Sequence, residues 1–409
     1  MEQGSLEIEA VTTTSGAKGG HPESAWRILL IFLRLGVIAF GGPVAHLGFF
    51  RTEFVERRRW LSEASYAELI ALCQFLPGPS SSQVGMALGL SRAGYRGALA
   101  AWFGFTLPSA VALTVLALGL TTWGARLPDG LVHGLKVMAV AVVAQAVWGM
   151  ARLLCTDGRR WALTIMAGCV AVLWSAPVSQ VLIMSMAAGL GVCLLKPSAI
   201  RHEQDVVIGV SRRAGGAMLA LFVILLIGLP WWAQHSDATL LQLFVGFYRS
   251  GALVFGGGHV VLPLLEQTVV ASGWVDSDTF LAGYAATQAM PGPLFSFSAF
   301  LGAAIDGWVG ALVCVLAIFL PSMLLVVGVL PFWQVLRTNP RAQAALAGVN
   351  AAVVGLLLAA LYQPLWTTGI LAPVDFALML LALLALVIWK WPPWLVVALG
   401  GAAGVLISL

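Results

Sequence analysis

The chain has 409 residues, of which 60% are hydrophobic and only 10% are charged. Globular domains average about 45–50% apolar and about 25% charged residues. So few charges cannot cover a soluble protein of this length, and disordered chains are rich in charge, so the composition excludes both classes. The long apolar runs predict an all-α membrane protein with many spans, because membrane β-barrels show short alternating segments instead. The net charge of +4 fits basic membrane loops and gives no reason to expect nucleic-acid binding.

Residues 1–24 are polar and predict a flexible tail, because they lack the basic start and apolar run of a signal peptide. We expect a first transmembrane repeat over residues 25–200, a linker with one connecting helix over 201–236, and a second repeat over 237–409. Apolar stretches of about 20 residues, the length that spans a bilayer, support this division. They lie near 26–50, 97–122, 131–153, 160–175, 178–195, 214–233, 239–258, 308–333, 342–362, 374–391 and 393–408.

Two further apolar segments, 64–92 and 278–304, are each interrupted by Pro-Gly-Pro. Proline lacks a backbone N–H, and the residue before it avoids helical dihedral angles, so no helix continues through this tripeptide. Each segment is therefore expected to form two half-helices that meet at a turn inside the membrane. Irregular backbone at that depth is tolerated only where protein or a water-filled cavity covers it.

The second half of the chain repeats the first. The matching pairs are FLRLGVIAFGG at 32–42 with FYRSGALVFGG at 247–257, QFLPGP at 74–79 with QAMPGP at 288–293, and LPS at 107–109 with LPS at 320–322. Arginines cluster at 51–59 in the first copy, whereas the region 266–278 of the second copy is acidic. Because cytoplasmic loops are enriched in basic residues, we expect two homologous repeats of inverted orientation. The number of crossings and the side of the N-terminus stay open.

Arg34 and Arg249 occupy the same place in the two copies, inside apolar segments. A charge in the bilayer is costly, so each arginine is expected to face a cavity or a partner. One interpretation is a structural ion pair, and the other is an anion ligand, because guanidinium donors match an oxyanion. The glycines that end these segments either pack helices closely or expose backbone amides to a substrate. They are Gly41, Gly42, Gly256 and Gly257.

The second half-helix of each broken segment opens with serines, which are Ser80, Ser81 and Ser82 in the first copy and Ser296 and Ser298 in the second. A helix N-terminus carries partial positive charge and free N–H groups, so two such ends that face each other predict an anion site. Capping of the helix by serine is the alternative. The predicted site includes the turns and the glutamines before them, which alternatively satisfy freed backbone groups: Gln74, Pro77, Gly78, Pro79, Gln288, Pro291, Gly292 and Pro293.

Four titratable residues near these segments are candidates for proton coupling: Glu53, Glu266, His46 and His259. The glutamates are alternatively interfacial, or paired with the arginines, and the histidines are alternatively structural. The sequence contains no nucleotide-binding, metal-binding or nucleophile motif. We therefore expect no enzyme activity, no cofactor and no metal, and any transport is secondary or passive.

The paired FGG elements, each followed by a tryptophan and then by Pro-Gly-Pro, resemble the chromate ion transporter family. This resemblance extends over residues 26–409. It implies a multi-pass inner-membrane protein that exports chromate, confers chromate resistance and draws on the proton-motive force. The copies differ after the break, because Leu294 and Phe295 stand where the first copy has serines.

The resulting hypothesis is chromate efflux by alternating access. Chromate is expected between the two broken segments, with Arg34 and Arg249 balancing its charge. A permease for sulfate or another oxyanion is the first alternative, and a membrane binding protein without flux is the second. The expected partners are the oxyanion and the lipid bilayer, and a homodimer is left open.

Overall fold

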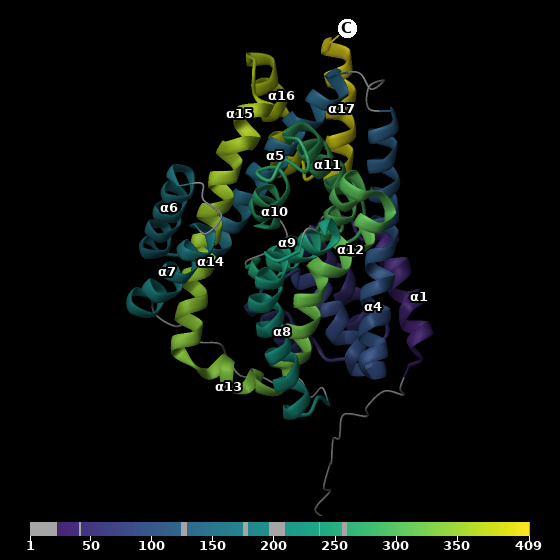
Figure 1. Ribbon diagram of the computed structural model, residues 1–409, viewed down its shortest axis with the longest axis vertical. Helices are drawn as coiled ribbons and strands as arrows, with labels where there is room; N and C mark the ends of the chain where they lie inside the picture. The colour runs from purple at the N-terminus through teal and green to yellow at the C-terminus, as the bar shows by residue number, and fades with distance from the viewer. Residues whose placement is uncertain are drawn as a thin grey trace, which may run out of the picture.

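In the computed structural model, the described residues are 23–40, 42–123, 129–174, 179–195, 209–236, 238–255 and 260–408. All regular secondary structure in these ranges is helical (Figure 1). The first copy contains α1 (Ala25–Ile38), α2 (Gly42–Phe50), the π-helix η1 (Arg51–Arg57), α3 (Glu63–Phe75), α4 (Ser80–Trp123), α5 (Asp129–Leu154), α6 (Gly158–Leu173) and α7 (Ser179–Leu194). The connecting helix is α8 (Arg212–Ala233).

The second copy follows the same order of elements. It contains α9 (Thr239–Leu253), α10 (Val261–Val269), α11 (Ser277–Ala289), η4 (Leu294–Ser296), α12 (Phe297–Val329), η5 (Leu330–Phe332), α13 (Trp333–Thr338), α14 (Pro340–Ala360), η6 (Leu361–Trp366), α15 (Thr367–Gly369), α16 (Pro373–Leu383), η7 (Leu384–Ile388) and α17 (Pro393–Ser408). Both interrupted segments form two helical arms around Pro-Gly-Pro, as the missing proline N–H groups predict.

The apolar stretches and the helices differ at two places in the first copy. The stretch 26–50 is not one span, because α1 ends at Ile38 and α2 begins at Gly42. The stretch 97–122 is not separate from the broken segment, because α4 continues through a kink at Ala93 and Gly94. The second copy has the same kink at Asp306 and Gly307.

The backbone angles at these kinks show how closely the copies match. Ala93 has φ −139° and ψ 27°, and Asp306 has φ −143° and ψ 38°. Gly94 and Gly307, with φ of 58° and 57°, turn the chain so that the helix doubles back on itself. A kink repeated at the same position with the same angles is a property of the duplicated unit.

Five helical segments of the described residues are long and apolar enough to span a membrane. They are Ser80–Leu120, Gly130–Leu154, Arg212–Ala233, Leu294–Phe332 and Pro340–Gly369. The segments Ser179–Leu194, Pro373–Ile388 and Pro393–Ile407 are apolar but shorter. Together these helices make the chain an all-α, multi-pass membrane protein.

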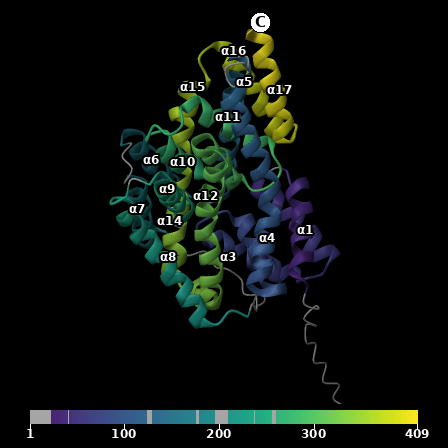
Figure 2. The same cartoon turned by 45° about the vertical axis from the view of Figure 1, so that its right-hand side comes forward.

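Helices α5 and α14, which come next in the chain after α4 and α12, each pack against the other copy. Helix α5 lies along α16 and α17, and α14 lies along α6 and α7 (Figures 1 and 2). Gly134 of α5 faces the backbone of Gly400, and Gly348 of α14 faces the backbone of Ala187. Contacts that are reciprocal in this way relate two units by a twofold axis, so the copies have pseudo-twofold symmetry.

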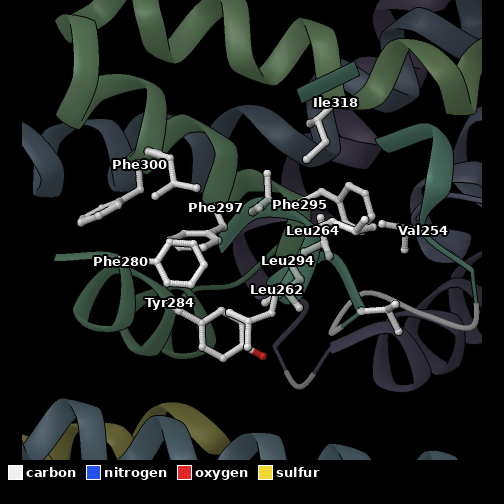
Figure 3. Close-up of a cluster of buried hydrophobic side chains, with 14 of the residues drawn as sticks. Val254, Leu262, Leu264, Phe280, Tyr284, Leu294, Phe295, Phe297, Phe300 and Ile318 are labelled. Atoms are coloured by element: carbon white, nitrogen blue, oxygen red, sulfur yellow. The ribbon is translucent and has the colours of Figure 1, made fainter. Parts of the chain in front are cut away.

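An aromatic cluster surrounds the second break (Figure 3). Phe295 is completely buried beside Phe319, with ring centroids 5.9 Å apart, and Phe297 packs on Phe280 and Tyr284. The apolar residues that replace serines in the second copy therefore fill a core. The two copies share the same backbone conformation but differ in the side chains around the Pro-Gly-Pro breaks.

Candidate functional site

Each Pro-Gly-Pro turn is hydrogen-bonded to the other copy. The Gly78 N–H donates to the carbonyl of Val254 at 2.6 Å, and the Gly292 N–H donates to the carbonyl of Ala39 at 3.0 Å. Ala39 and Val254 directly follow α1 and α9. The ends of both first helices and both turns thus meet in one region, around the pseudo-twofold axis.

Glycine is required at the centre of both turns. Gly78 and Gly292 have φ of +122° and +99°, angles that residues with a Cβ rarely adopt. A Cβ on Gly78 would lie 2.2 Å from Ser322 Oγ, and a Cβ on Gly292 would lie 2.7 Å from Ser109 Oγ. The two serines belong to the matching LPS motifs, so each turn packs directly on the LPS motif of the other copy.

A cavity of about 850 Å³ opens where the two turns meet. It brings together six of the predicted site residues: Gly42, Gln74, Gly78, Ser80, Gln288 and Gly292. It also brings in polar residues that the sequence did not single out, namely Gln145, Arg152, Thr287, Asn350 and Lys390. Among the described residues that line the cavity there is no aspartate or glutamate.

The charges and dipoles of this cavity favour an anion. Arg152 and Lys390 supply two positive charges, and the four amide side chains are donors that adapt to an oxyanion. Ser80 is the first residue of α4, so the positive end of that helix also faces the cavity. With no opposing carboxylate on the described wall, the cavity is suited to a compact oxyanion.

His46 joins the two copies beside the cavity. Its Nε2 donates to the Ala39 carbonyl at 3.1 Å, the same carbonyl that accepts from the Gly292 N–H. The Ser81 hydroxyl lies 3.3 Å from Nδ1, which accepts in this tautomer. The imidazole is only 1% exposed and contacts the Phe105 ring edge-on. This arrangement gives His46 a structural contact with both breaks.

The other serines lie behind the cavity wall. Ser296 is hydrogen-bonded to Ser109 at 2.7 Å, and Ser298 donates to the Phe295 carbonyl at 2.8 Å. The hydroxyls of Ser82 and Ser322 are buried without a hydrogen-bond partner among the described residues. Burial of an unpaired hydroxyl is unfavourable, so the first break retains unused polar groups that the second break has satisfied.

The prolines of the two turns fix the shape of the site. Gln83 lies within the first turn of α4 and donates from Nε2 to the Pro77 carbonyl at 2.7 Å. Pro79 immediately precedes α4, and Pro293 caps η4 with an extended φ and ψ. Pro291 begins the second turn. None of these four rings lines the cavity, so the prolines shape the backbone and the glycines face the space.

The two duplicated arginines do not line the cavity. Arg34 lines a separate pocket of about 620 Å³ with residues of α1, α2 and η1. Arg249 lines a third pocket of about 260 Å³ with residues of α7, α8, α9 and α10. The expected arrangement, with both arginines facing the two broken segments, is therefore not the one in the structure, because each guanidinium lies on the outer side of its own first helix.

The carboxylate candidates also lie away from the cavity. Burial alone would raise the pKa of Glu53, but hydrogen bonds and charges from Arg58 and Arg57 outweigh it and hold this pKa below its usual range. The contacts are 2.7 Å and 3.2 Å, so Glu53 stays ionised at neutral pH. Glu266 is half-buried on α10 and forms no ion pair with a described residue. Gly41, Gly256, Gly257 and His259 lie outside the described residues.

The cationic residues of the cavity were missed because their sequence context resembles loops. Arg152 lies in the last turn of α5, where a run of basic residues begins that is typical of a cytoplasmic loop. Lys390 lies between Trp389 and Trp391 at the end of η7, and two prolines follow. Its φ of +56° is unusual for a non-glycine residue. The sequence feature that could have indicated Lys390 is its position as a lone lysine between two apolar stretches.

The sequence profile described as "Chromate transporter" matches residues 26–192 and 241–405, on either side of α8. The chain belongs to the chromate transporter family. This family member is 28% identical to a probable chromate transport protein of Synechococcus elongatus over 94% of its own length and 96% of the relative. It is 28% identical to a chromate transport protein of Pseudomonas aeruginosa over 82% and 80% of the two chains.

A third relative of this family member is a chromate transport protein of Cupriavidus metallidurans, with 29% identity over 85% of each chain. No solved structure matches the chain. Membership of the chromate transporter family places the chain among membrane transport proteins and not among enzymes. The matched regions contain both Pro-Gly-Pro turns and both LPS motifs, so the central cavity is built from the family's own elements.

Proposed function

We propose that the chain is a secondary transporter that exports chromate across the plasma membrane and binds it in the central cavity. The observation that carries this proposal is the lining of the cavity, which combines Arg152, Lys390 and four amide side chains without a carboxylate among the described residues. The names of the three relatives give the substrate, which is a tetrahedral dianion.

Chromate offers four oxygens and two negative charges to this wall. Arg152 and Lys390 balance the charges, and Gln74 and Gln288, equivalent positions in the two copies, donate hydrogen bonds. Ser80 adds the N-terminus of α4, where backbone N–H groups favour an anion. Substrate binding by Arg34 and Arg249 is not part of the proposal, since both line other pockets.

A pseudo-twofold pair of repeats around one site supports alternating access. We propose that the repeats have inverted orientations, which is supported by the arginines of η1 and the acidic residues at the matching place in the second copy. Thr52 and Gln267 are matching positions outside the long spans. In a background without native cysteines, Thr52→Cys and Gln267→Cys should react with an impermeant thiol reagent from opposite sides. Labelling from the same side would contradict inversion.

The membrane potential supplies enough energy for export. A charge gains about 2.3 kcal/mol per 100 mV, so a dianion leaving a negative interior gains about 4.6 kcal/mol. At about 1.4 kcal/mol per tenfold change, this supports a concentration ratio of roughly 2,000. No proton-carrying side chain is needed for this driving force.

The test is chromate flux in proteoliposomes under an imposed potential. Wild type is expected to move chromate toward the positive side, and Lys390→Gln is expected to lose most of this flux because one of two cavity charges is removed. Arg213→Gln, an exposed residue at the start of α8, is the matched control and should transport normally. The absence of potential-dependent chromate flux, or normal flux in Lys390→Gln, would refute the proposal. A sulfate flux that chromate does not inhibit would instead identify a permease for another oxyanion.

A further inference from the structure

Arg34 lies on an outward-facing apolar stripe of α1. Leu30, Val37 and Ile38, which are four residues before it and three and four residues after it, are 47%, 52% and 42% exposed. Residues at these spacings share one face of a helix. Both views place α1 at the edge of the molecule beside α4 (Figures 1 and 2). The guanidinium therefore emerges from a surface that is otherwise suited to lipid.

The pocket beside Arg34 has two chemically different walls. Ile31, Leu35, Ile38 and Phe49 form an apolar wall from α1 and α2. The other wall is formed by η1 and its C-cap Arg58, with Arg51, Thr52, Arg57 and Arg58 around Glu53. The pocket thus joins an apolar surface to an interfacial group of arginines, an arrangement that matches a molecule with an anionic head and an apolar tail.

The charges around this pocket leave one arginine without a carboxylate. Both oxygens of Glu53 are engaged, one by Arg58 at 2.7 Å and the other by Arg57 at 3.2 Å. Arg51 is held by Glu56 and Glu63 at 2.5 Å and 2.6 Å. No ion pair between Arg34 and a described residue exists, so four arginines face three glutamates. A ligand with one negative charge would complete the group.

The equivalent arginine of the second copy lies in different surroundings. Val245 and Ala252, which correspond to Leu30 and Val37, are only 7% and 2% exposed. Gln180 of α7 and Ala233 of α8 line the pocket of Arg249, and Figure 1 shows α9 between α8, α10 and α12. The connecting helix α8 packs on α9. Both arginines are exposed, so the copies differ in their apolar neighbours. The positions beside Arg249 are buried, whereas those beside Arg34 form an open apolar stripe.

We propose that the Arg34 pocket binds an anionic phospholipid. The phosphate group contacts Arg34 and the free donors of Arg57, and an acyl chain lies along Ile38 and Phe49. Anionic lipids are concentrated at the cytoplasmic face, where basic segments next to membrane helices attract them. A free oxyanion would gain nothing from the apolar wall, so the tail is what distinguishes this site from the central cavity.

The experiment titrates the purified, delipidated full chain with phosphatidylglycerol and follows bound lipid by native mass spectrometry, with phosphatidylcholine as the uncharged reference. Arg34→Gln is expected to weaken phosphatidylglycerol binding about tenfold or more, the effect of losing a hydrogen bond between charged groups. Arg249→Gln is the matched control and should bind as wild type does. Thr52→Glu adds a negative charge at an exposed interfacial position and should weaken binding, whereas Gln267→Glu, its counterpart in the second copy, should not.

Thr52→Glu keeps the proposal testable if Arg34→Gln fails to fold, as judged by size-exclusion chromatography. Equal phosphatidylglycerol binding by wild type and a folded Arg34→Gln or Thr52→Glu would overturn the proposal. Displacement of the lipid by inorganic phosphate at equal concentration would show a free-oxyanion site instead. If the chain forms a dimer without lipid, and Arg34→Gln separates this dimer, then a second copy of the chain occupies the Arg34 pocket.

Discussion

The replacement of Gly78 by alanine tests the contact between the first Pro-Gly-Pro turn and the LPS motif of the second copy. An added Cβ at Gly78 meets three obstacles, one of which is Gln83 Nε2 at 2.7 Å. The backbone has φ +122°, and Ser322 Oγ would lie 2.2 Å from the new atom. The backbone strain costs roughly 1–3 kcal/mol, and overpacking costs roughly 1–3 kcal/mol more. Gly78→Ala is therefore expected to lower the free energy of unfolding by about 2–6 kcal/mol.

A second substitution separates the two terms. Ser322→Ala removes the atom at 2.2 Å and leaves Ser322 Cβ at 3.3 Å from the new methyl group. By itself it should be nearly neutral, because the hydroxyl is buried without a partner among the described residues. In Gly78→Ala/Ser322→Ala the part of the steric term due to Ser322 should be recovered, giving a coupling energy of roughly 1–3 kcal/mol. The backbone strain and the contact with Gln83 Nε2 at 2.7 Å remain.

The equivalent residues of the second copy provide the control for this double-mutant cycle. Gly292→Ala would place a Cβ 2.7 Å from Ser109 Oγ, but that hydroxyl is bonded to Ser296 at 2.7 Å. Ser109→Ala therefore loses a hydrogen bond and should recover little. The free energies are measured by unfolding in mixed micelles, followed by tryptophan fluorescence, together with chromate flux. A Gly78→Ala protein as stable as wild type, or a cycle in which Ser322→Ala recovers nothing, would refute the reasoning.

Three further predictions concern the cavity, the packing between copies and the basic segment. Arg152→Gln should raise the KM for chromate flux about tenfold or more, because a charged hydrogen-bond donor is lost; an unchanged KM would exclude Arg152 from binding. Gly348→Ala places a Cβ 2.0 Å from the Ala187 carbonyl and should cost roughly 1–3 kcal/mol, whereas Gly189→Ala in α7, with nothing within 4 Å, should be neutral or stabilising in the same unfolding assay. Glu53→Gln should lower the melting temperature at pH 7 but not at low pH. The folded pKa of Glu53 is below its ordinary value of 4.5, so its stabilising effect is full above that pH and disappears as the pH falls through the folded value. A difference that persists in acid would contradict this.

The features predicted correctly from the sequence depend on local chemistry. Pro-Gly-Pro interrupts a helix wherever it occurs, and both breaks are found where the tripeptides stand. The kinks at Gly94 and Gly307 were not predicted, although a glycine stood at each matching place. A single glycine inside an apolar stretch is compatible with a continuous membrane helix, so its effect depends on the surrounding packing.

The features that could not be predicted depend on contacts between distant segments. Gly134 and Gly348 are ordinary small residues in the sequence, and only the structure shows that each packs on a hairpin of the other copy. Arg152 and Lys390 reach one cavity from α5 and from the end of η7, which are more than 200 residues apart. No periodicity or motif links them. The polar wall of the cavity therefore depends on the packing of α5 and α14 against helices of the other copy.

The two arginines show why equal positions in a repeat need not have equal roles. Arg34 and Arg249 match in sequence, and α1 and α9 make similar close contacts with α4 and α12 through Gly36 and Gly251. The difference arises outside the repeated unit, because α8 connects the copies and packs on α9 and α12 of the second. Both arginines are exposed, but the apolar positions beside Arg249 are buried and those beside Arg34 are open. A pseudo-twofold protein with a single connecting helix necessarily has two unlike outer surfaces, so an argument from duplication holds for the backbone around the axis and weakens with distance from it.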